Sequence, residues 1–420
     1  MIKNCFTIFF AAFVMQFLEG CNLSKDRERY KGFDKVIDIK NIKSLVGTRS
    51  QSIIDLNIPS SDSMAFDYNK NLKDVYFVKL ETSKKSKFGS IDKIFITDSR
   101  IIIVDLTVSK SVLIFDSVGS FINKISTNEI LENKGGVIPH FGSVTYDYNN
   151  NEIILHSVEK EKLYYFDKDG HFLNPSKEYI YFLDFVSLKN CDNYIYYNPV
   201  GGNGHIPILN NSPIYIGKKN ANIQYETSEI FKGFKGRNFY INANPSFNAG
   251  SDVFYTPDFS DTIYQVSGNP VAISPRVVIH FPGISINEKL KEVKEQTIEN
   301  FVRLLNKQQY YSFKGEIFCN PDSVYFIKTY KKTETGYFYS ARTKNILGGE
   351  LVSSIQLGGS AQIEAYRYPA TTFKDYFVSI LPTANFGKSK WTTTIELNNI
   401  KNKIKPGDNP VLAFYKLKDF

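Results

Sequence analysis

The sequence of 420 residues has few of the residue types that build metal clusters or disulfide frameworks, with only four cysteines and five histidines. No two cysteines have CxxC spacing, and no two histidines have the separation that ligates zinc from one strand or helix. The motifs GxSxG, HExxH and GxxxxGK[ST] do not occur either. These absences exclude the zinc clusters, hydrolase elbows and phosphate loops that a sequence alone can reveal.

Charge of one sign is not concentrated anywhere along the chain. The formal net charge is +8, but lysines and arginines are interspersed with aspartates and glutamates instead of gathering into a stripe. This pattern is typical of a solvated surface rather than of a nucleic-acid footprint. We therefore expect no nucleic-acid partner.

Long hydrophobic runs are also missing, apart from one at the N-terminus. The run Phe6–Leu18 follows Lys3 and has about the length of a secretory signal, too short to span a bilayer comfortably. The ending Leu18-Glu19-Gly20-Cys21 resembles bacterial lipoprotein signals, although Glu19 departs from the usual small or aliphatic residue. The resemblance implies removal of residues 1–20 and acylation of Cys21. A plain signal peptide with an incidental cysteine is the alternative.

Two cysteines remain in the mature chain, Cys191 and Cys319, 128 residues apart. An oxidising compartment allows a disulfide between them. Two separate buried thiols are the favoured interpretation.

Aromatic residues, by contrast, are abundant, with 34 Phe and 27 Tyr, and they favour strands. The segment Ile101–Phe121 returns 51 residues later as Glu152–Phe172, with Phe-Asp and Gly at matching positions. A period of about 40 to 50 residues carried by short strands is typical of propeller blades. In this repeat His156 takes the place of Asp105, which predicts a structural polar position at a strand end.

Six blades fit the length of the chain. Strands are expected at Ile94–Thr97, Ile101–Asp105, Val112–Asp116 and Phe121–Lys124, and again at Val144–Tyr148, Glu152–His156 and Leu163–Asp167. Core strands of four further blades are expected at Tyr194–Tyr197, Val253–Tyr255 with Thr262–Val266, Ser323–Lys328 with Tyr337–Ala341, and Tyr376–Leu381. The last strand, Val411–Leu417, is expected to complete a sheet whose other strands come from the opposite end of the chain.

The fold prediction is thus an all-β, six-bladed β-propeller over residues 74–420 with one inserted amphipathic helix. Residues 21–73 are expected to form a tether and an N-terminal packing segment, with a brief strand at Val36–Ile39. The helix begins where Ser285 and Glu288 have capping-box spacing. Its apolar face is predicted to contain Leu290, Val293, Thr297, Phe301, Leu304 and Leu305. We expect it to pack on a propeller rim; docking of a partner is the alternative.

Four segments in this order resemble the six-bladed β-propeller lipoproteins of Gram-negative anaerobes. They are Val78–Thr82, Ile114–Phe121, Phe259–Tyr264 and Asp408–Leu412. The resemblance implies an NHL-like propeller in the cell envelope and no settled biochemical activity. Members of that family commonly have a Gly-Pro-Gly-Glu-Tyr-like loop after the first blade, where this chain has Gly135–Phe141 without the acidic residue.

Candidate site residues lie in predicted loops. A propeller brings one residue of each blade to its channel, so His140, His205 and either Asp258 or Asp261 are candidates to converge around a cation. The favoured interpretation is structural, with scattered histidines and with aspartates that make turn hydrogen bonds.

The glycine-rich segment Gly201–His205 is predicted to be the most flexible loop. Loops on a rigid scaffold often contact ligands, so Gly202, Asn203 and His205 rank first as ligand-binding residues.

The primary functional hypothesis is a non-enzymatic binding lipoprotein of the cell envelope, anchored through Cys21, with the outer membrane as its expected location and its facing open. Abundant Tyr, Phe and Asn suit a glycan, peptide or envelope-protein partner, because aromatic faces stack while amides hydrogen-bond. No cofactor is expected. The alternative is a hydrolase or lyase with a metal-assisted site at the channel mouth.

Overall fold

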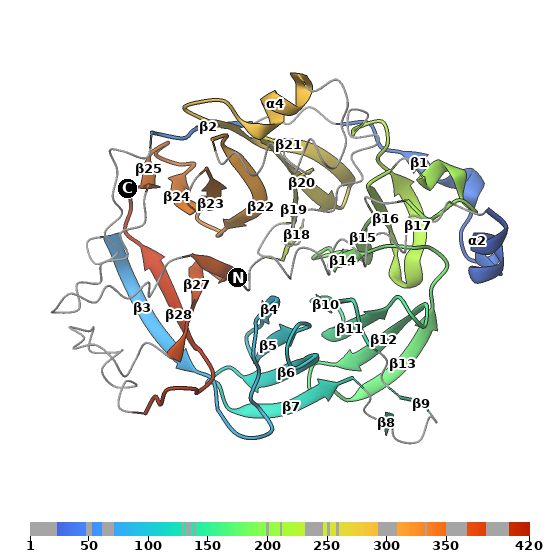
Figure 1. Cartoon of the computed structure of the whole chain (residues 1–420), viewed down its shortest axis with the longest axis horizontal. Coiled ribbons are helices and arrows are strands. Elements are labelled where there is room, and N and C mark those ends of the chain that lie inside the picture. The colour runs from blue at the N-terminus through green and yellow to red at the C-terminus, as the bar shows by residue number, and fades with distance from the viewer. Residues whose placement is uncertain are drawn as a thin grey trace.

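The computed structural model describes residues 23–47, 53–60, 71–127, 130–131, 136–137, 140–198, 201–210, 212–231, 247–249, 253–257, 260–292, 309–331, 334–349, 368–383 and 403–420. Six sheets of four or five strands stand around a central axis (Figure 1). The chain is an all-β, six-bladed β-propeller, and the prediction from the repeat is confirmed.

Each blade is built on an antiparallel meander whose first strand lies nearest the axis and whose fourth strand lies at the rim (Figure 1). Blade 1 contains β4 (Lys93–Ile96), β5 (Arg100–Asp105), β6 (Ser111–Asp116) and β7 (Phe121–Ser126). Blade 2 contains β10 (Ser143–Asp147), β11 (Glu152–Ser157), β12 (Lys162–Asp167) and β13 (Phe172–Lys177). Blade 3 contains β14 (Asp184–Ser187), β15 (Asn193–Tyr197), β16 (Ile214–Lys218) and β17 (Asn222–Glu226).

The second half of the ring continues this pattern. Blade 4 contains β18 (Phe247–Ala249), β19 (Val253–Tyr255), β20 (Thr262–Gly268) and β21 (Val271–His280). Blade 5 contains β22 (Ser312–Cys319), β23 (Val324–Tyr330), β24 (Glu334–Ser340) and β25 (Ile346–Gly349). Blade 6 contains β26 (Pro369–Phe373), β27 (Tyr376–Leu381), β28 (Val411–Leu417) and β3 (Leu72–Lys79). The short pair β8 (Ile130–Leu131) and β9 (Gly136–Val137) lies between blades 1 and 2 in sequence.

The middle strands of a blade are buried on both faces because a neighbouring blade covers each side. In β5, every residue from Ile101 to Asp105 is buried, and the same holds for Ile153–Ser157 of β11. This double burial explains why the sequence shows continuous apolar runs instead of strict alternation.

Ring closure joins the two ends of the chain. In blade 6, the outer strand β3 pairs antiparallel with β28, from Val411 opposite Lys79 to Leu417 opposite Leu72. The prediction that the last blade combines strands from both chain ends is confirmed. The predicted division of its strands is wrong, because only β3 comes from the N-terminal side and the three other strands are C-terminal. Closure across one blade removes a free sheet edge.

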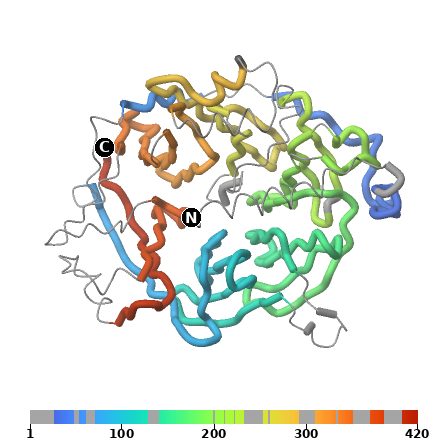
Figure 2. Tube along the Cα trace, viewed as in Figure 1, coloured from blue at the N-terminus to red at the C-terminus, as the bar shows by residue number. Residues whose placement is uncertain are grey.

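Residues 23–60, as far as they are described, form a strap along the rim, which we call the N-terminal strap. It contains α2 (Leu23–Arg29), the 3-10 turns η1 (Phe33–Lys35) and η2 (Ile39–Asn41), β1 (Lys43–Ser44) and β2 (Ile54–Asn57). β1 pairs parallel with β17, and β2 pairs parallel with β21, so the strap adds a fifth strand to blades 3 and 4 (Figure 2). The strand predicted at Val36–Ile39 is wrong, because this stretch connects the two 3-10 turns.

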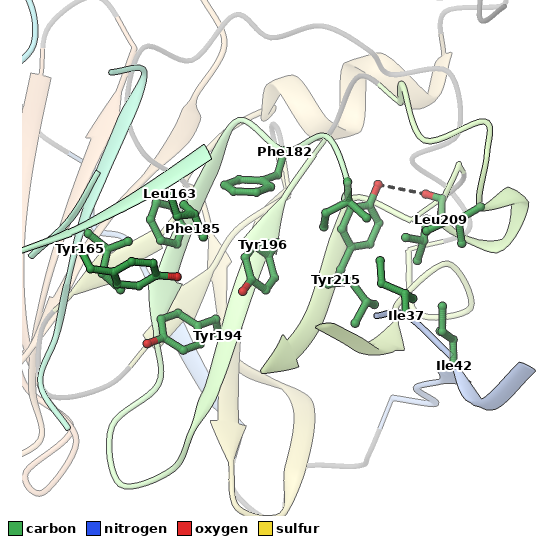
Figure 3. Packing of buried hydrophobic residues seen from close by; sticks show 14 residues of the cluster. Ile37, Ile42, Leu163, Tyr165, Phe182, Phe185, Tyr194, Tyr196, Leu209 and Tyr215 are labelled. Atoms are coloured by element: carbon green, nitrogen blue, oxygen red, sulfur yellow. Dashed lines mark hydrogen bonds between the residues drawn. The ribbon is translucent and has the colours of Figure 1, made fainter. Parts of the chain in front are cut away.

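The strap packs through aliphatic side chains at the rim between blades 2 and 3. Ile37 and Ile42 join the buried cluster that contains Leu209 and Tyr215, whose hydroxyl donates to the Leu209 carbonyl at 3.1 Å (Figure 3). The 3-10 turn η4 (Pro207–Leu209) presents Leu209 to this cluster. Burial of Ile37 and Ile42 holds the N-terminal strap against the blades, because its own strands are too short to do so.

Two helices are described outside the blades. α4 (Ile286–Glu292) begins with the predicted capping box, in which the Ser285 N–H donates to Glu288 Oε2 at 3.2 Å and the Glu288 N–H donates to Ser285 Oγ at 3.1 Å. Its Leu290 is buried, whereas the further predicted face residues Val293, Thr297, Phe301, Leu304 and Leu305 lie outside the described residues. No helix in the described part is both long and apolar enough to cross a bilayer.

Cys191 and Cys319 are both free thiols, as the favoured interpretation predicted. Cys319 is buried in the core between blades 4 and 5, and Cys191 is partly buried.

The two faces of the ring differ in the length of their connections. We call the face where the innermost strands begin the upper face and the opposite face the lower face. Connections on the lower face are short, as in residues 97–99 and 117–120. The longest connections lie on the upper face, as in residues 198–213 and 281–311, although other upper-face turns, such as 106–110 and 158–161, are short. The predicted loop residues that the structure describes, Gly202, Asn203, His205, His140 and Asp261, all belong to upper-face connections.

Candidate functional site

A cavity of about 320 Å³ lies on the propeller axis, between the innermost strands of blades 1, 2, 3, 5 and 6. We call it the axial cavity. Its wall combines aromatic side chains with charged ones: Phe95, Phe185, Phe318, Lys93, Glu316 and Lys328. A mostly apolar wall with a few convergent polar groups is typical of small-ligand sites.

Beside the axial cavity, the first residues of three innermost strands form a polar cluster, and one of them, Lys93, lines the cavity. Lys93 of β4 contacts Asp184 of β14 (Nζ–Oδ1, 2.6 Å) and donates to the Val144 carbonyl at 3.1 Å. The Ser143 hydroxyl donates to the same Asp184 oxygen. Blades 1, 2 and 3 each contribute one partner, so this cluster forms only when these three neighbouring blades pack side by side.

The opposite side contains a bulge in β22 of blade 5. Phe313 is paired with Thr329 and Ile317 with Ile327, so Lys314, Gly315 and Glu316 face a single residue of β23. Gly315 has a φ of +89°, a left-handed conformation that favours glycine. Bulges of this kind re-aim side chains and occur often beside active sites.

The bulge directs Glu316 into a network with two residues of β23. The Glu316 carboxylate accepts from the Lys328 ammonium and from the Tyr330 hydroxyl, the latter at 2.6 Å. Lys328 also lies 5.0 Å from the centre of the Tyr368 ring. Burial lowers the pKa of the neighbouring Lys314, and Glu334 only partly offsets this effect.

A threonine hydroxyl completes the wall. Thr145 of β10 lines the axial cavity, and only 1% of the residue is exposed. Its Oγ1 makes no hydrogen bond within the described part of the chain. Because the Oγ1 atom itself is buried, a ligand in the cavity can become its partner only when the neighbouring side chains of the wall shift.

The predicted loop Gly201–His205 lies under the N-terminal strap. Asn203 is fully buried, and its side chain accepts from the Tyr181 N–H (2.7 Å) and donates to the Tyr181 carbonyl (2.9 Å). His205 is also buried, and its Nε2 donates to the Tyr179 carbonyl at 2.8 Å while its ring stacks on Tyr30 (4.7 Å). Burial lowers the pKa of the His205 imidazole.

The loop Gly201–His205 therefore forms part of the surface on which the N-terminal strap packs. Gly202 has a φ of +93°, and the Gly204 N–H donates to Asp26 of α2 at 3.1 Å. These contacts hold the segment that its glycines predicted to be flexible. A ligand contact at Gly202, Asn203 or His205 stays a prediction.

The structure does not bring the other predicted residues together with His205. Asp261 accepts from the Ser285 hydroxyl (2.8 Å) and from Asn287 (3.2 Å), and burial raises the pKa of its carboxyl although these hydrogen bonds oppose the shift. This is the structural role favoured for it. His140 is exposed just before blade 2, while Asp258 and Cys21 lie outside the described residues. Within the described ranges, no three His, Cys, Asp or Glu side chains are placed to hold a metal ion.

Sequence reasoning missed the residues of the axial cavity. Lys93, Glu316 and Lys328 stand in unrelated sequence contexts, as does Asp184, the partner of Lys93, and only the ring brings them together. One signal was available, because Gly315 interrupts the strand pattern of Ser312–Cys319, and glycine inside a strand often marks a bulge.

The closed ring and its axial cavity define a six-bladed β-propeller with a candidate small-ligand site on its axis. The profile of a family described as "domain of unknown function (DUF4934)" matches residues 51–416. The chain belongs to this family. No match was found among the curated proteins.

Several solved structures are similar to this chain, and one of them shares its fold clearly. A Bacteroides fragilis protein described as exported has a TM-score of 0.65 at 17% identity, with 88% of this chain and 100% of that chain covered. A member of the DUF4221 family from Bacteroides vulgatus has a TM-score of 0.46 at 9% identity, covering 83% and 98%. A streptogramin B lyase has a TM-score of 0.37 at 10% identity, covering 84% and 100%. At 17% identity the likeness to the Bacteroides fragilis protein concerns the fold alone, and the other two structures support no conclusion.

Proposed function

We propose that the protein is an exported, lipid-anchored binding module of the cell envelope whose ligand enters the axial cavity from the upper face. The observation that carries this proposal is the axial cavity itself, with its ion pairs, aromatic wall and the Thr145 hydroxyl. The lower-face turns are short, whereas the upper-face connections offer additional contact surface.

A glycan is the ligand class that this wall fits best. Sugar rings pack their C–H faces on aromatic side chains, and their hydroxyls both donate and accept hydrogen bonds. The wall supplies Tyr368 and Phe318 for packing, carboxylates as acceptors and ammonium groups as donors. A volume of about 320 Å³ is at the lower end of the usual range for ligand pockets, which suits one or two sugar units of a longer chain.

The test is a screen of oligosaccharides and peptides against the chain from Asn22 onward, which keeps every described element. We expect oligosaccharides to bind and peptides not to bind. Thr145→Val is expected to lower the affinity about 3- to 10-fold through loss of one hydrogen bond to the ligand. Its thermal stability should stay unchanged or rise slightly, because no described partner loses a hydrogen bond.

Thr343→Val is the matched control, since Thr343 is exposed in a lower-face turn. It should bind like the wild-type protein. Equal affinity of Thr145→Val and the wild-type protein would contradict binding at the axial cavity, and selective binding of peptides would replace the proposed ligand class.

Export and lipid anchoring are supported by the N-terminal run that ends in Cys21 and by the exported Bacteroides fragilis protein of the same fold. We expect the wild-type protein to incorporate a labelled fatty acid and to sediment with membranes. Cys21→Ala should lose the label and appear in the soluble fraction. A labelled Cys21→Ala variant, or an unlabelled wild-type protein, would exclude acylation at this residue.

A further inference from the structure

Lys314 occupies an unusual position at the edge of the axial cavity. It is the first residue of the β22 bulge, and the next two residues, Gly315 and Glu316, line the cavity. Its Nζ lies 3.9 Å from the centre of the Tyr330 ring, and the hydroxyl of the same ring donates to Glu316. One tyrosine side chain therefore connects Lys314 to the cavity wall.

The Lys314 ammonium differs from the other lysines at the axis in its partners. Lys93 has Asp184, and Lys328 has Glu316. Within the described ranges Lys314 makes no hydrogen bond or ion pair with another residue; the Glu334 carboxylate attracts it only through space, and Tyr330 is its one aromatic contact. The attraction of a cation to an aromatic face is modest and compensates only part of the cost of a half-buried charge.

An anionic group at this position would remove that imbalance. It would add a charge-assisted hydrogen bond to the ammonium, the strongest class of polar contact available to a lysine. The Glu316 carboxylate does not fill this role, because it already accepts from Lys328 and Tyr330. In the bulge, the Glu316 carboxylate thus has hydrogen-bond donors, whereas the Lys314 ammonium has no hydrogen-bond acceptor within the described ranges.

We propose that Lys314 is an anion-binding residue, and that the glycan bound at the axial cavity carries a carboxylate or sulfate group that contacts its ammonium. This inference rests on the proposed function and makes the ligand class narrower. The carboxylate of an acidic sugar and a sulfate ester offer the same oxygen acceptors, so both belong to the proposal.

The test uses two matched pairs of probes, measured by calorimetry with the chain from Asn22 onward. The first pair is trigalacturonic acid and its neutral methyl ester, and the second is 6-sulfated lactose and lactose. The wild-type protein is expected to bind the anionic member of at least one pair about tenfold more tightly or better. The pair that shows the larger ratio identifies the anionic group.

Lys314→Met should reduce this preference to about threefold or less, while Lys314→Arg should keep most of it. Lys331→Met is the matched control, because Lys331 also lies over a tyrosine, at 4.4 Å from the Tyr311 ring centre, but belongs to the exposed turn after β23. It should bind both pairs like the wild-type protein. Thermal unfolding of each variant shows that the fold is kept.

Equal binding of anionic and neutral probes by the wild-type protein would overturn this inference and leave the proposed function standing. A preference that survives in Lys314→Met would overturn it as well, since the anion would then be bound elsewhere. Absence of binding by every oligosaccharide would overturn the proposed function and this inference together.

Discussion

Asp105 shows how a single carboxylate organises the upper end of blade 1. It is fully buried and accepts from the backbone N–H groups of Gly89 (2.8 Å), Ser90 (3.1 Å) and Val108 (2.8 Å), among others. Burial alone would raise the pKa of its carboxyl, but these donors together with the Ser90 hydroxyl outweigh burial and hold the pKa well below its usual range.

The same position in blade 2 contains another buried polar residue. His156 contacts Glu178 (Nε2–Oε2, 3.0 Å), and burial raises the pKa of the Glu178 carboxyl while His156 partly opposes the shift. The repeat therefore predicted the position correctly as a structural one. It did not predict the partners, because Gly89 and Glu178 lie outside the repeated segments.

The low pKa of the Asp105 carboxyl predicts how the stability of the fold depends on pH in acid. A carboxyl whose pKa is lower in the folded protein stabilises the fold above its unfolded pKa of about 3.9, and this contribution is lost as the pH falls below that value. We expect Asp105→Asn to lower the free energy of unfolding by about 2 kcal/mol at pH 7. The difference from the wild-type protein should shrink between about pH 4 and pH 2.

Urea unfolding at several pH values measures this difference. Asp98→Asn is the control, since Asp98 is a lower-face residue whose side chain is 80% exposed and pairs with Lys374. It should change stability by less than about 0.5 kcal/mol. A difference between Asp105→Asn and the wild-type protein that is the same at every pH would refute the electrostatic role of Asp105.

At the scale of elements, a turn of blade 1 contacts the closing strand of blade 6. Gly119 has a φ of +90°, and a Cβ built on it would lie 2.2 Å from the carbonyl oxygen of Lys79 at the end of β3. The Glu81 N–H donates to the Gly119 carbonyl at 2.8 Å. Glycine at this turn thus serves both the hairpin and the contact between first and last blade.

Gly407 offers a matched comparison for this turn. Its φ is +88°, but a Cβ there would meet nothing within 4 Å. We expect Gly407→Ala to cost about 1 kcal/mol of unfolding free energy from the left-handed backbone alone. Gly119→Ala should cost about 3 kcal/mol because the clash with Lys79 adds to this strain. Equal losses in urea unfolding would show that the close approach to β3 is unimportant.

Elements differ in how far the sequence predicts them. All four strands of blade 1 and the first three of blade 2 were predicted within about one residue at most ends, because the two blades repeat the same apolar runs and turn glycines, whereas β13 was not predicted. The strap strands β1 and β2 were not predicted. They have two and four residues, and their partners β17 and β21 lie far along the chain. Strands this short have no periodicity to detect.

The glycine-rich loop illustrates the limit of local reasoning. Gly201–His205 has the composition of a mobile loop, yet Tyr30 and Asp26 of the strap contact it. A sequence pattern records local backbone preference, whereas this burial depends on a segment well over a hundred residues earlier.

At the scale of the whole molecule, the candidate site is a product of ring closure. Innermost strands from five blades line the axial cavity, and each contributes only one to a few side chains to the wall. The number of blades follows from the repeat and from chain length. The identity of the axial residues does not, because the charged groups of the wall come from separate parts of the chain, apart from the neighbours Asp92 and Lys93. The fold was thus predictable from the sequence, and the axial site was not.

The lower face contains a second cavity of about 350 Å³ between blades 5 and 6, lined by Lys73, Arg342, Lys416 and Asp375 among others. Its charged groups pair across the surface, as Arg342 does with Asp419 at 2.7 Å and Lys416 with Asp375 at 2.5 Å. These pairs are solvent-exposed and contribute little to stability. This cavity is the natural competitor of the axial cavity in any binding experiment.

The most direct measurement is a structure of the protein in complex with the oligosaccharide that binds most tightly in the screen. We predict sugar density on the propeller axis, between Lys93 of β4 and Lys328 of β23, within reach of the Thr145 hydroxyl. Density confined to the lower-face cavity or to the outer rim, with the axial cavity free of sugar, would contradict the account.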